Sequence, residues 1–262
     1  MELPLDLWYS AIRHRYSHRT YNGEQLGNDT LGILEELCGK FRPFRGVRAI
    51  ILRSPPKGVY KGIIGSYGEI KNAPHLAAII GEIPVPEVQE AAGYLGEGII
   101  LQATSMGLRT CWIGGFFRPE ALEQAIELGE NEEILAITPI GYGGNKKSTR
   151  DRVMSLAIRS QRRKPLEKLL THSDTVLSPW TKQALEAARL APSAANRQPW
   201  RFTVDSESII VSTSKGTSYS RISKRLDCGI AMLHLELGAR AYGAKGKWEL
   251  LSAPYVAKYS IS

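Results

Sequence analysis

The order of predicted elements in the first part of the chain recurs in the last part, and this recurrence limits the possible folds most strongly. A helix, a loop, a short strand and a long, mostly apolar helix follow one another twice. The first series covers residues 31–38, 41–47, 48–53 and 87–106, and the second covers residues 181–190, 191–199, 200–204 and 221–243. Identity between the two is too low to prove a duplication, so the repeat rests on the pattern. Strands interleaved with helices favour an α+β or α/β arrangement.

Other segments complete this outline. The spacing of apolar residues predicts further helices over residues 2–12, 119–129 and 148–160, and strands over residues 75–80, 134–140 and 209–212. Gly107 ends the first long helix, and Ser178 followed by proline opens the helix of the second series.

Length and composition exclude several classes of protein. A chain of 262 residues with 43% apolar residues can bury a sizeable core, either as one large domain or as two modest ones. No apolar run approaches the roughly 18–20 residues that span a bilayer. The first residues, Met-Glu-Leu-Pro-Leu-Asp, carry no basic flank, so we expect no secretory signal there.

Cysteine and histidine usage argues against disulfides and metal sites. The three cysteines, Cys38, Cys111 and Cys228, are odd in number and far apart, which favours a reducing cytoplasm. The five histidines include no pair at metal-ligand spacing on a predicted helix. We therefore expect no metal centre.

The chain is basic, with 34 Lys and Arg against 26 Asp and Glu, a formal charge of +8. Such an excess can serve solubility, or it can attract nucleic acid, a membrane or a phosphorylated ligand. The sequence contains no recognisable nucleic-acid-reading motif, and its aromatic residues show no stacking pattern. Part of the excess is concentrated in residues 13–19 and 161–164.

The most informative segment is Ala-Pro-Ser-Ala-Ala-Asn-Arg-Gln-Pro-Trp at residues 191–200, between a predicted helix and a predicted strand. Proline, small residues and asparagine end the helix and predict a tight polar loop. Ser193, Asn196 and Gln198 would offer polar atoms to a planar heterocycle. The alternative is an ordinary helix-ending turn.

A second segment places Arg15, Ser17 and Arg19 at alternate positions. In an extended chain such positions share one face, so two guanidinium groups and a hydroxyl would converge, a set that suits phosphate oxygens. The alternative is a basic surface loop.

A third segment, Gly-Leu-Arg-Thr-Cys-Trp-Ile-Gly-Gly at residues 107–115, follows the first long helix. Its final pair, Gly114 and Gly115, would let the backbone approach a ligand closely, although a helix end and a turn would use glycine too. Residues 141–148 follow a strand but lack the glycine that precedes Lys-Ser in a P-loop. Ser66 does not lie in a Gly-x-Ser-x-Gly elbow.

Together these segments resemble the nitroreductase family of FMN-dependent oxidoreductases. The matching motifs are the Arg-x-Ser-x-Arg-x-aromatic stretch at residues 15–21, the glycine segment at 107–115, the strand ending in Gly-Tyr at 134–142, Arg-x-Pro-Leu-Glu at 163–167 and the complete loop at 191–200. The resemblance implies a nitroreductase-like α+β fold with a central, mainly antiparallel sheet flanked by helices.

The order of the motifs departs from the usual family, in which the Pro-Ser-x-x-Asn loop lies soon after the phosphate motif. Here residues 41–47 occupy that place and lack the motif, which stands in the second half instead. Because typical members are homodimers whose sites draw on both subunits, the resemblance implies an intramolecular pseudo-dimer, as in the duplicated "putative TM nitroreductase" branch. We expect halves at residues 1–165 and 166–262, one FMN site between them, and a monomer.

Residue roles follow from the resemblance. It implies that Arg15, Ser17, Arg19 and Arg163 hold the FMN phosphate, and that Pro192, Ser193, Ala194 and Asn196 line the ring and ribityl chain. It also implies that the Gly114 N–H, the one catalytic group, points at flavin N5 with Ile113 and Gly115 beside it, and that Ser66 or Tyr67 touches the pyrimidine edge. Gln198 and Trp200 are expected to brace the loop.

The implied activity is electron transfer from NAD(P)H through FMN to a conjugated acceptor such as a nitroaromatic or a quinone, in a ping-pong cycle. Two alternatives remain: a non-catalytic or degenerate flavin-binding protein, and a basic nucleic-acid-binding protein. The fit to three specific motifs favours a small-molecule acceptor as partner, without nucleic acid or membrane.

Overall fold

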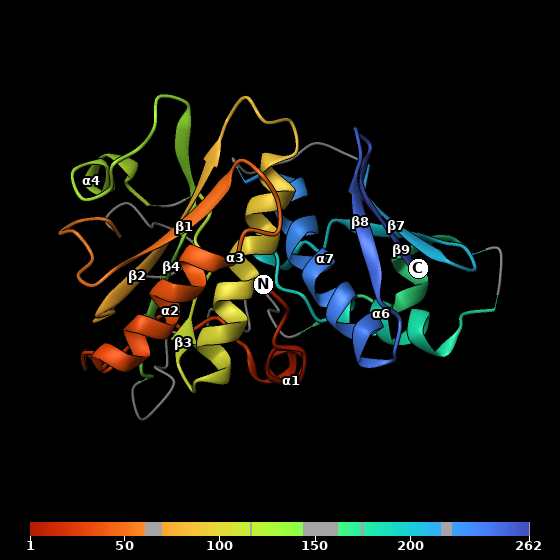
Figure 1. The fold of residues 1–262 in the computed structure, drawn as a ribbon, viewed down its shortest axis with the longest axis horizontal. Helices are drawn as coiled ribbons and strands as arrows, with labels where there is room; N and C mark the ends of the chain where they lie inside the picture. Colours follow the sequence, from red (N-terminus) through yellow and green to blue (C-terminus); the bar gives the residue numbers. More distant parts are fainter. Residues whose placement is uncertain (61–69, 116, 144–161, 174–175, 216–221, 262) are drawn as a thin grey trace.

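The strands form two separate sheets with two long helices between them (Figure 1). A computed structural model describes residues 1–60, 70–115, 117–143, 162–173, 176–215 and 222–261 of the chain. The first sheet has the order β1-β2-β4-β3, from β1 (Val47–Leu52), β2 (His75–Glu82), β3 (Arg109–Thr110) and β4 (Glu132–Gly141). The second has the order β5-β6-β7-β9-β8, from β5 (Leu170–Ser173), β6 (Trp200–Val204), β7 (Ser208–Thr213), β8 (Gly246–Leu250) and β9 (Tyr255–Ile261).

The same arrangement of elements appears in both halves. In the first, α2 (Asn28–Lys40), two strands, α3 (Val88–Ser105) and two further strands follow one another; in the second, α6 (Pro179–Arg189) and α7 (Lys224–Ala241) take the places of α2 and α3. Each half pairs its strands antiparallel in the order first, second, fourth, third. The strand β5 adds to the edge of β6 in parallel. Outside this scheme lie α1 (Leu5–His14) and α4 (Pro119–Glu123).

The helices α3 and α7 are buried on nearly all sides, which explains why most of their residues are apolar or small. Their closest approach depends on two glycines. A Cβ on Gly93 would lie 2.0 Å from the Leu226 carbonyl oxygen, and a Cβ on Gly229 would lie 2.0 Å from the Glu90 carbonyl oxygen. The contact is reciprocal, because each glycine meets the residue three positions before the other one.

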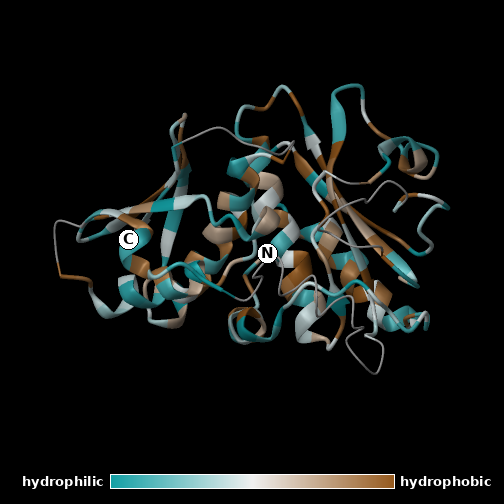
Figure 2. Cartoon of the chain, turned by 180° about the vertical axis from the view of Figure 1, so that it is seen from behind, coloured by the Kyte–Doolittle hydropathy of each residue, from teal (hydrophilic) through white to brown (hydrophobic). Residues whose placement is uncertain are grey.

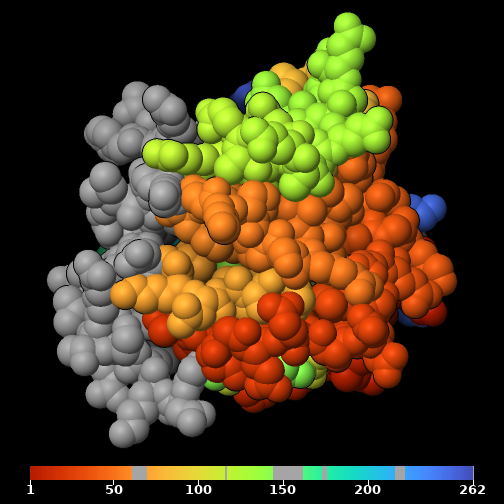
Figure 3. Space-filling view, turned by 90° about the vertical axis from the view of Figure 1, so that its left-hand side faces the viewer, coloured from red at the N-terminus to blue at the C-terminus, as the bar shows by residue number. Residues whose placement is uncertain are grey.

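The strand β2 explains a second feature of the sequence, an apolar run without alternation. Ala77 and Ile79 face the main core, whereas Leu76, Ala78 and Ile80 face a smaller apolar cluster on the other side of the sheet. Both faces of the strand are therefore covered. Figure 2 shows hydrophobic residues gathered on the central helices and on the strands beside them. In Figure 3, the coloured atoms at one end of the molecule belong almost wholly to the first half, with α2, β1 and the α4 region on the surface.

The predicted fold class is confirmed: the chain has an α+β fold with mainly antiparallel strands. The prediction of one central sheet differs from the structure, because the strands divide into two sheets and the helices α3 and α7 occupy the centre. The helix predicted over residues 119–129 ends early, where the Ala125 N–H donates to the Leu122 carbonyl and tightens the last turn. The helix predicted over residues 148–160 lies outside the described residues.

Candidate functional site

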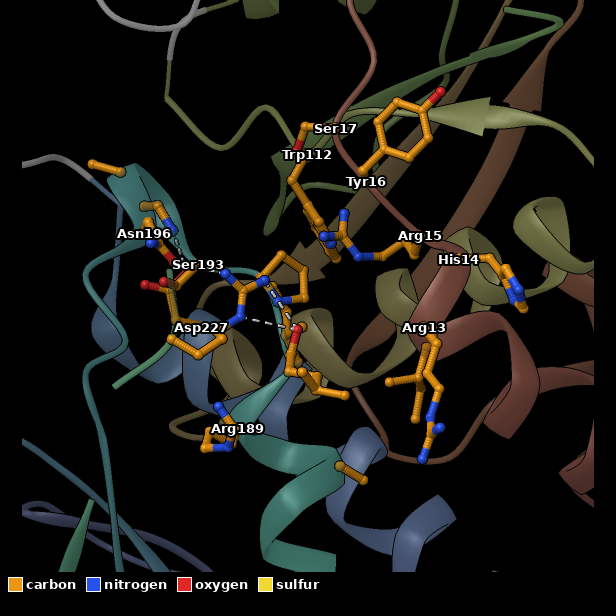
Figure 4. Close-up of a pocket in the computed structure, with 18 of the residues that line it drawn as sticks. Arg13, His14, Arg15, Tyr16, Ser17, Trp112, Arg189, Ser193, Asn196 and Asp227 are labelled. Atoms are coloured by element: carbon orange, nitrogen blue, oxygen red, sulfur yellow. Dashed lines mark hydrogen bonds between the residues drawn. The ribbon is translucent and has the colours of Figure 1, made fainter. Parts of the chain in front are cut away.

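A cavity of about 700 Å³ lies where the two halves meet. Its wall is built from the end of α1 with the residues after it, the segment after β3, the connector at Arg163, the end of α6 with its loop, and the first turns of α7. Figure 4 shows Arg15 and Trp112 on one side and Ser193 and Asn196 on the other. The predicted site residues on this wall are Arg15, Ser17, Arg19, Gly114, Arg163, Pro192, Ser193, Ala194 and Asn196.

The segment after α1 is extended, as the alternating spacing predicts. Ser17 forms a parallel bridge with Thr110, and the His18 N–H donates to the Thr110 carbonyl at 2.8 Å. Arg15, whose side chain is only 6% exposed, and the buried Arg19 both reach the cavity. Their Nε atoms are buried and make no hydrogen bond within the described part of the chain. Buried donors without partners are costly, so they indicate a ligand that accepts hydrogen bonds.

Arg163 brings a further positive charge to the same wall. Its Nε and Nη2 donate to the Leu190 carbonyl at 3.3 and 3.1 Å, and its Nη1 donates to Asn196 Oδ1 at 3.1 Å. Burial, together with the positive charges of Arg15 and Arg189, lowers the pKa of Arg163 to about 10. Like charges held this close make the cavity wall a binding surface for an anion.

The loop after α6 has a tight backbone. Ala195, Asn196 and Gln198 have φ values of 49°, 54° and 48°, in the left-handed region that residues with a Cβ rarely adopt. Ser193 Oγ accepts from the Gln198 N–H at 2.9 Å, and Gln198 Oε1 accepts from the Lys164 N–H at 2.7 Å. Several residues therefore hold one strained conformation, as is common at functional sites.

Two predictions for this loop can be compared with these contacts. Gln198 braces the loop as expected, and Trp200 is fully buried. Asn196 lines the cavity, but its side chain also bonds within the protein: Oδ1 accepts from Arg163 and Nδ2 donates to the Arg162 carbonyl at 2.8 Å. Asn196 therefore orients Arg163.

Asp227, in the first turn of α7, is a cavity residue that the sequence reasoning missed. Its Oδ1 accepts from the Ala194 N–H at 3.0 Å and its Oδ2 accepts from Arg197 Nε at 2.6 Å, so it anchors the loop. Burial raises the pKa of Asp227 to about 6, although Arg197 acts in the opposite direction. An acidic residue at the start of a mostly apolar helix is the signal that could have identified it.

The glycine pair meets the cavity only in part. Gly114 lies on the wall, and a Cβ there would be 3.3 Å from Ile222 Cγ2. Gly115 also packs against Ile222, with a would-be Cβ 3.1 Å from its Cγ1. Ile113 bridges to Ile137 of β4 and packs into the smaller apolar cluster. Ile113 and Gly115 are thus outside the set that lines the cavity, while Ser66 and Tyr67 lie outside the described residues.

Beneath the wall lies a second set of residues that sequence reasoning missed. Glu97, in the middle of α3, is fully buried. Its Oε2 accepts from Trp112 Nε1 at 2.7 Å, and its Oε1 is 2.8 Å from His234 Nε2 of α7. Arg15 Nε lies 3.9 Å from the same Oε1. Burial lowers the pKa of Arg15, and the negative charge of Glu97 acts in the opposite direction.

Two features are absent from the described residues. Within the ranges given above, no group of three or more His, Cys, Asp or Glu side chains could hold a metal ion. None of the helices there is both long and apolar enough to cross a membrane. All three cysteines are free and buried.

Comparison with known proteins places these features in a family. No curated protein matches the chain. Among solved structures, a putative nitroreductase from Thermotoga maritima shares 20% identity with a TM-score of 0.64, covering 97% of this chain and 93% of its own. A nitroreductase family protein from Clostridium novyi shares 20% identity with a TM-score of 0.45 over 58% of this chain and 91% of its own. A nitroreductase with bound FMN from Bacteroides fragilis shares 20% identity with a TM-score of 0.42, over 52% and 88%.

A family model gives the most direct assignment, because it spans most of the chain and includes every cavity residue named above. It covers residues 8–239, from within α1 to near the end of α7. On this match, the chain belongs to the nitroreductase family described as "Putative TM nitroreductase".

Proposed function

We propose that the cavity binds FMN, with the phosphate at the end formed by Arg15, Ser17, Arg19 and Arg163. The observation that carries this proposal is the set of buried guanidinium groups on one wall, two of which have an Nε without a hydrogen bond in the described part of the chain. A phosphate ester with about two negative charges at neutral pH would accept these donors and balance their charge. The cation set thus fits the phosphate end of this cofactor.

The remainder of the wall suits the flavin ring and ribityl chain. Pro192, Ser193 and Ala194 present the strained loop from the second half, and Gly114 presents backbone without a side chain from the first. We assign the Gly114 N–H to flavin N5, where a donor stabilises negative charge on the reduced ring. Asn196 contributes through Arg163, which it orients.

We further propose that the protein is an NAD(P)H:acceptor oxidoreductase. FMN, when bound, supplies two-electron transfer from the nicotinamide to a nitroaromatic, quinone or similar conjugated acceptor. The protein would bind and orient the cofactor, and donor and acceptor would use the cavity in turn, in a ping-pong cycle. This scheme requires no side-chain acid or base.

The arrangement of one site between two halves is also a proposal. The recurring element order, the shared strand order and the reciprocal contact of Gly93 and Gly229 support an internal duplication that acts as a pseudo-dimer. Residues 1–165 would supply the phosphate end and Gly114, and residues 166–262 would supply the loop. We therefore expect a monomer with one FMN per chain.

The first experiment separates flavin binding from catalysis. The purified protein should be yellow, or should bind added FMN with one site per chain by isothermal titration calorimetry. A colourless protein that does not bind FMN would contradict the cofactor assignment. Anaerobic mixing of the holoprotein with NADH or NADPH should bleach the flavin absorbance. If neither donor bleaches it, the protein is a flavin binder without reductase activity.

A further inference from the structure

The hydrogen bonds of the buried pair Glu97 and His234 indicate its protonation state. Both side chains are fully buried, Glu97 in α3 and His234 in α7, directly beneath Arg15 and Trp112 on the cavity wall. The distance from His234 Nε2 to Glu97 Oε1 is 2.8 Å, and that from His234 Nδ1 to the Ala187 carbonyl oxygen is 3.1 Å. Together these contacts determine how many protons the pair holds.

A carbonyl oxygen can only accept, so the contact with Ala187 requires a hydrogen on His234 Nδ1. In a neutral imidazole the other nitrogen, Nε2, is then an acceptor. Its contact with a carboxyl oxygen of Glu97 needs one more proton, carried either by the imidazole or by the carboxyl group. In both forms the net charge of the pair is zero.

The charge of the pair matters because of where Arg15 lies. Arg15 Nε is 3.9 Å from Glu97 Oε1, too far for a hydrogen bond but close enough for a strong electrostatic interaction at this depth. If the pair lost its proton, Glu97 would cancel the charge of Arg15. With the proton retained, the cation of Arg15 remains available to a ligand in the cavity.

The other two buried glutamates of the central helices have arginine partners: Glu90 in α3 pairs with Arg225, and Glu236 in α7 pairs with Arg240. Glu236 in α7 accepts from Trp248 Nε1 at 2.8 Å, as Glu97 accepts from Trp112, but Arg240 Nη2 neutralises it at 2.6 Å. Glu97 has the imidazole of His234 within hydrogen-bond distance instead. The groups that face the pair are Arg15 at the wall, the Trp112 indole, which donates to Glu97, and the Ala187 carbonyl from α6. Cys111 lies close to Arg15.

We propose that Glu97 and His234 are charge-setting residues that share one proton and thereby keep the phosphate end of the cavity cationic. They position and tune Arg15 without touching the ligand. This inference rests on the proposed function for its physiological ligand, but its physical content is the affinity of the wall for a phosphate group.

Three variants test whether Glu97 and His234 share one proton. His234→Gln can still donate one N–H to Glu97, but its amide cannot take up the shared proton, so with Glu97 ionised the pair becomes anionic. Affinity for FMN should fall about 10-fold or more, while affinity for riboflavin, which lacks the phosphate, should change less than about threefold. Glu97→Gln keeps the pair neutral, so the ratio of FMN to riboflavin affinity should stay within about threefold. The double variant Glu97→Gln/His234→Gln is neutral again and should restore that ratio.

Other results would overturn the inference. If Glu97→Gln alone tightened FMN binding about 10-fold, Glu97 would be an ionised carboxylate opposing the ligand in the wild type. Because this variant keeps the size of the side chain, it decides the question even if His234→Gln does not fold. Equal losses for FMN and riboflavin, without rescue in the double variant, would indicate a structural role alone.

The wild type and the same variants are also tested with inorganic phosphate in place of FMN. The measurement is the rise in melting temperature of each apoprotein when phosphate is added. His234→Gln should reduce this rise and the double variant should restore it. If the wild type binds phosphate in this pattern but does not bind FMN, the flavin proposal is wrong and the charge-setting role stands. If His234→Gln leaves the affinity for phosphate and FMN unchanged, the charge-setting role is wrong whatever the cofactor.

Discussion

The cavity and the corresponding place in the other half of the molecule have a similar backbone arrangement but different side chains. Gly229 lies 136 residues after Gly93 (229 − 93), and the same shift relates Gly107 to Gly243, which follow the two central helices with φ values of 77° and 82°. It also relates Trp112 to Trp248, whose indoles each donate to a buried glutamate. The recurring spacing thus pairs positions of the two halves directly.

In the second half, large side chains stand at the positions that correspond to the cavity wall. The shift pairs Gly114 and Ile230, both on the cavity wall, with Leu250 and Tyr94. Around Tyr94 lie Phe41 and Phe44, at ring centroid distances of 6.1 and 5.2 Å, from the segment that stands where the polar loop would be. Aromatic packing occupies the space that one half leaves open.

The difference teaches that backbone symmetry alone does not make a binding site in this fold. A site requires glycine at the edge of the first sheet, a strained polar loop and buried cations together. Where leucine and aromatic rings replace them, the same framework becomes core. The following predictions test this contrast, beginning with the largest expected effect.

Making the open side resemble the filled side should abolish binding. Gly114→Leu copies the residue at the paired position, and even its Cβ would lie 3.3 Å from Ile222 Cγ2, another residue of the cavity wall. We expect FMN affinity to fall at least about 1000-fold, or about 4 kcal/mol, in a fluorescence titration. The matched control is Leu250→Gly, which should leave FMN affinity unchanged. FMN binding by Gly114→Leu within tenfold of the wild type would show that Gly114 does not contact the cofactor.

Asp227 anchors the loop on the open side only, since the shift pairs it with Ala91. Its pKa is raised to about 6 in the folded protein from 3.8, so the folded state holds the proton more tightly than the unfolded chain does. Its contribution to stability is fully present below about pH 4 and is lost as the pH rises through about 6, by about 3 kcal/mol.

Asp227→Asn should remove this dependence. The free energy of unfolding of the wild type minus that of Asp227→Asn should decrease by about 3 kcal/mol between pH 3.5 and pH 7, because every other carboxylate is common to both proteins. Urea unfolding at a series of pH values measures this difference. A difference that stays flat with pH would mean that Asp227 titrates as an ordinary exposed carboxylate.

Arg15→Ala should weaken phosphate binding. Removal of a charged donor should cost about 1.5–3 kcal/mol of FMN affinity and leave riboflavin affinity almost unchanged. The control is Arg53→Ala, an arginine of the same half that pairs with Glu35 on the surface and lies outside the cavity wall. Calorimetric titration with both flavins measures the two affinities. Equal losses for both ligands would place Arg15 at the ring and not at the phosphate.

Local patterns predicted the fold well where one segment determined its own structure. The apolar runs of α3, α7 and β2, the extended segment at residues 15–19 and the loop after α6 lie where the sequence predicted them. Strands β8 and β9 were missed for different reasons. The residues of β8 alternate between half-buried and exposed, and the buried residues of β9, Val256, Ala257 and Tyr259, are interrupted by a lysine, so neither strand gives a strong apolar signal. The two-sheet division was missed because it depends on α3 and α7 packing together.

The same limit applies to the site. Arg15, Ser17, Arg163 and Ser193 are carried by short motifs, whereas Glu97 and His234 meet across 137 residues of chain. Neither residue has a motif around it, and each looks like an isolated polar group in an apolar helix. Only the packing of the two helices brings them together beneath Arg15. Long-range pairs of this kind are invisible to periodicity and spacing.

The smallest expected effect is a difference between two tryptophans, Trp112 and Trp248, that make the same kind of contact in the two halves. Trp112→Phe and Trp248→Phe each remove an indole N–H that donates to a buried glutamate, so each should lower the free energy of unfolding by about 1 kcal/mol. Only Trp112 lines the cavity, so only Trp112→Phe should also weaken FMN binding, by roughly fivefold. Chemical denaturation together with flavin titration measures both quantities for each variant. If Trp248→Phe weakened FMN binding as much as Trp112→Phe, the filled side would be coupled to the site and the contrast between the two halves would fail.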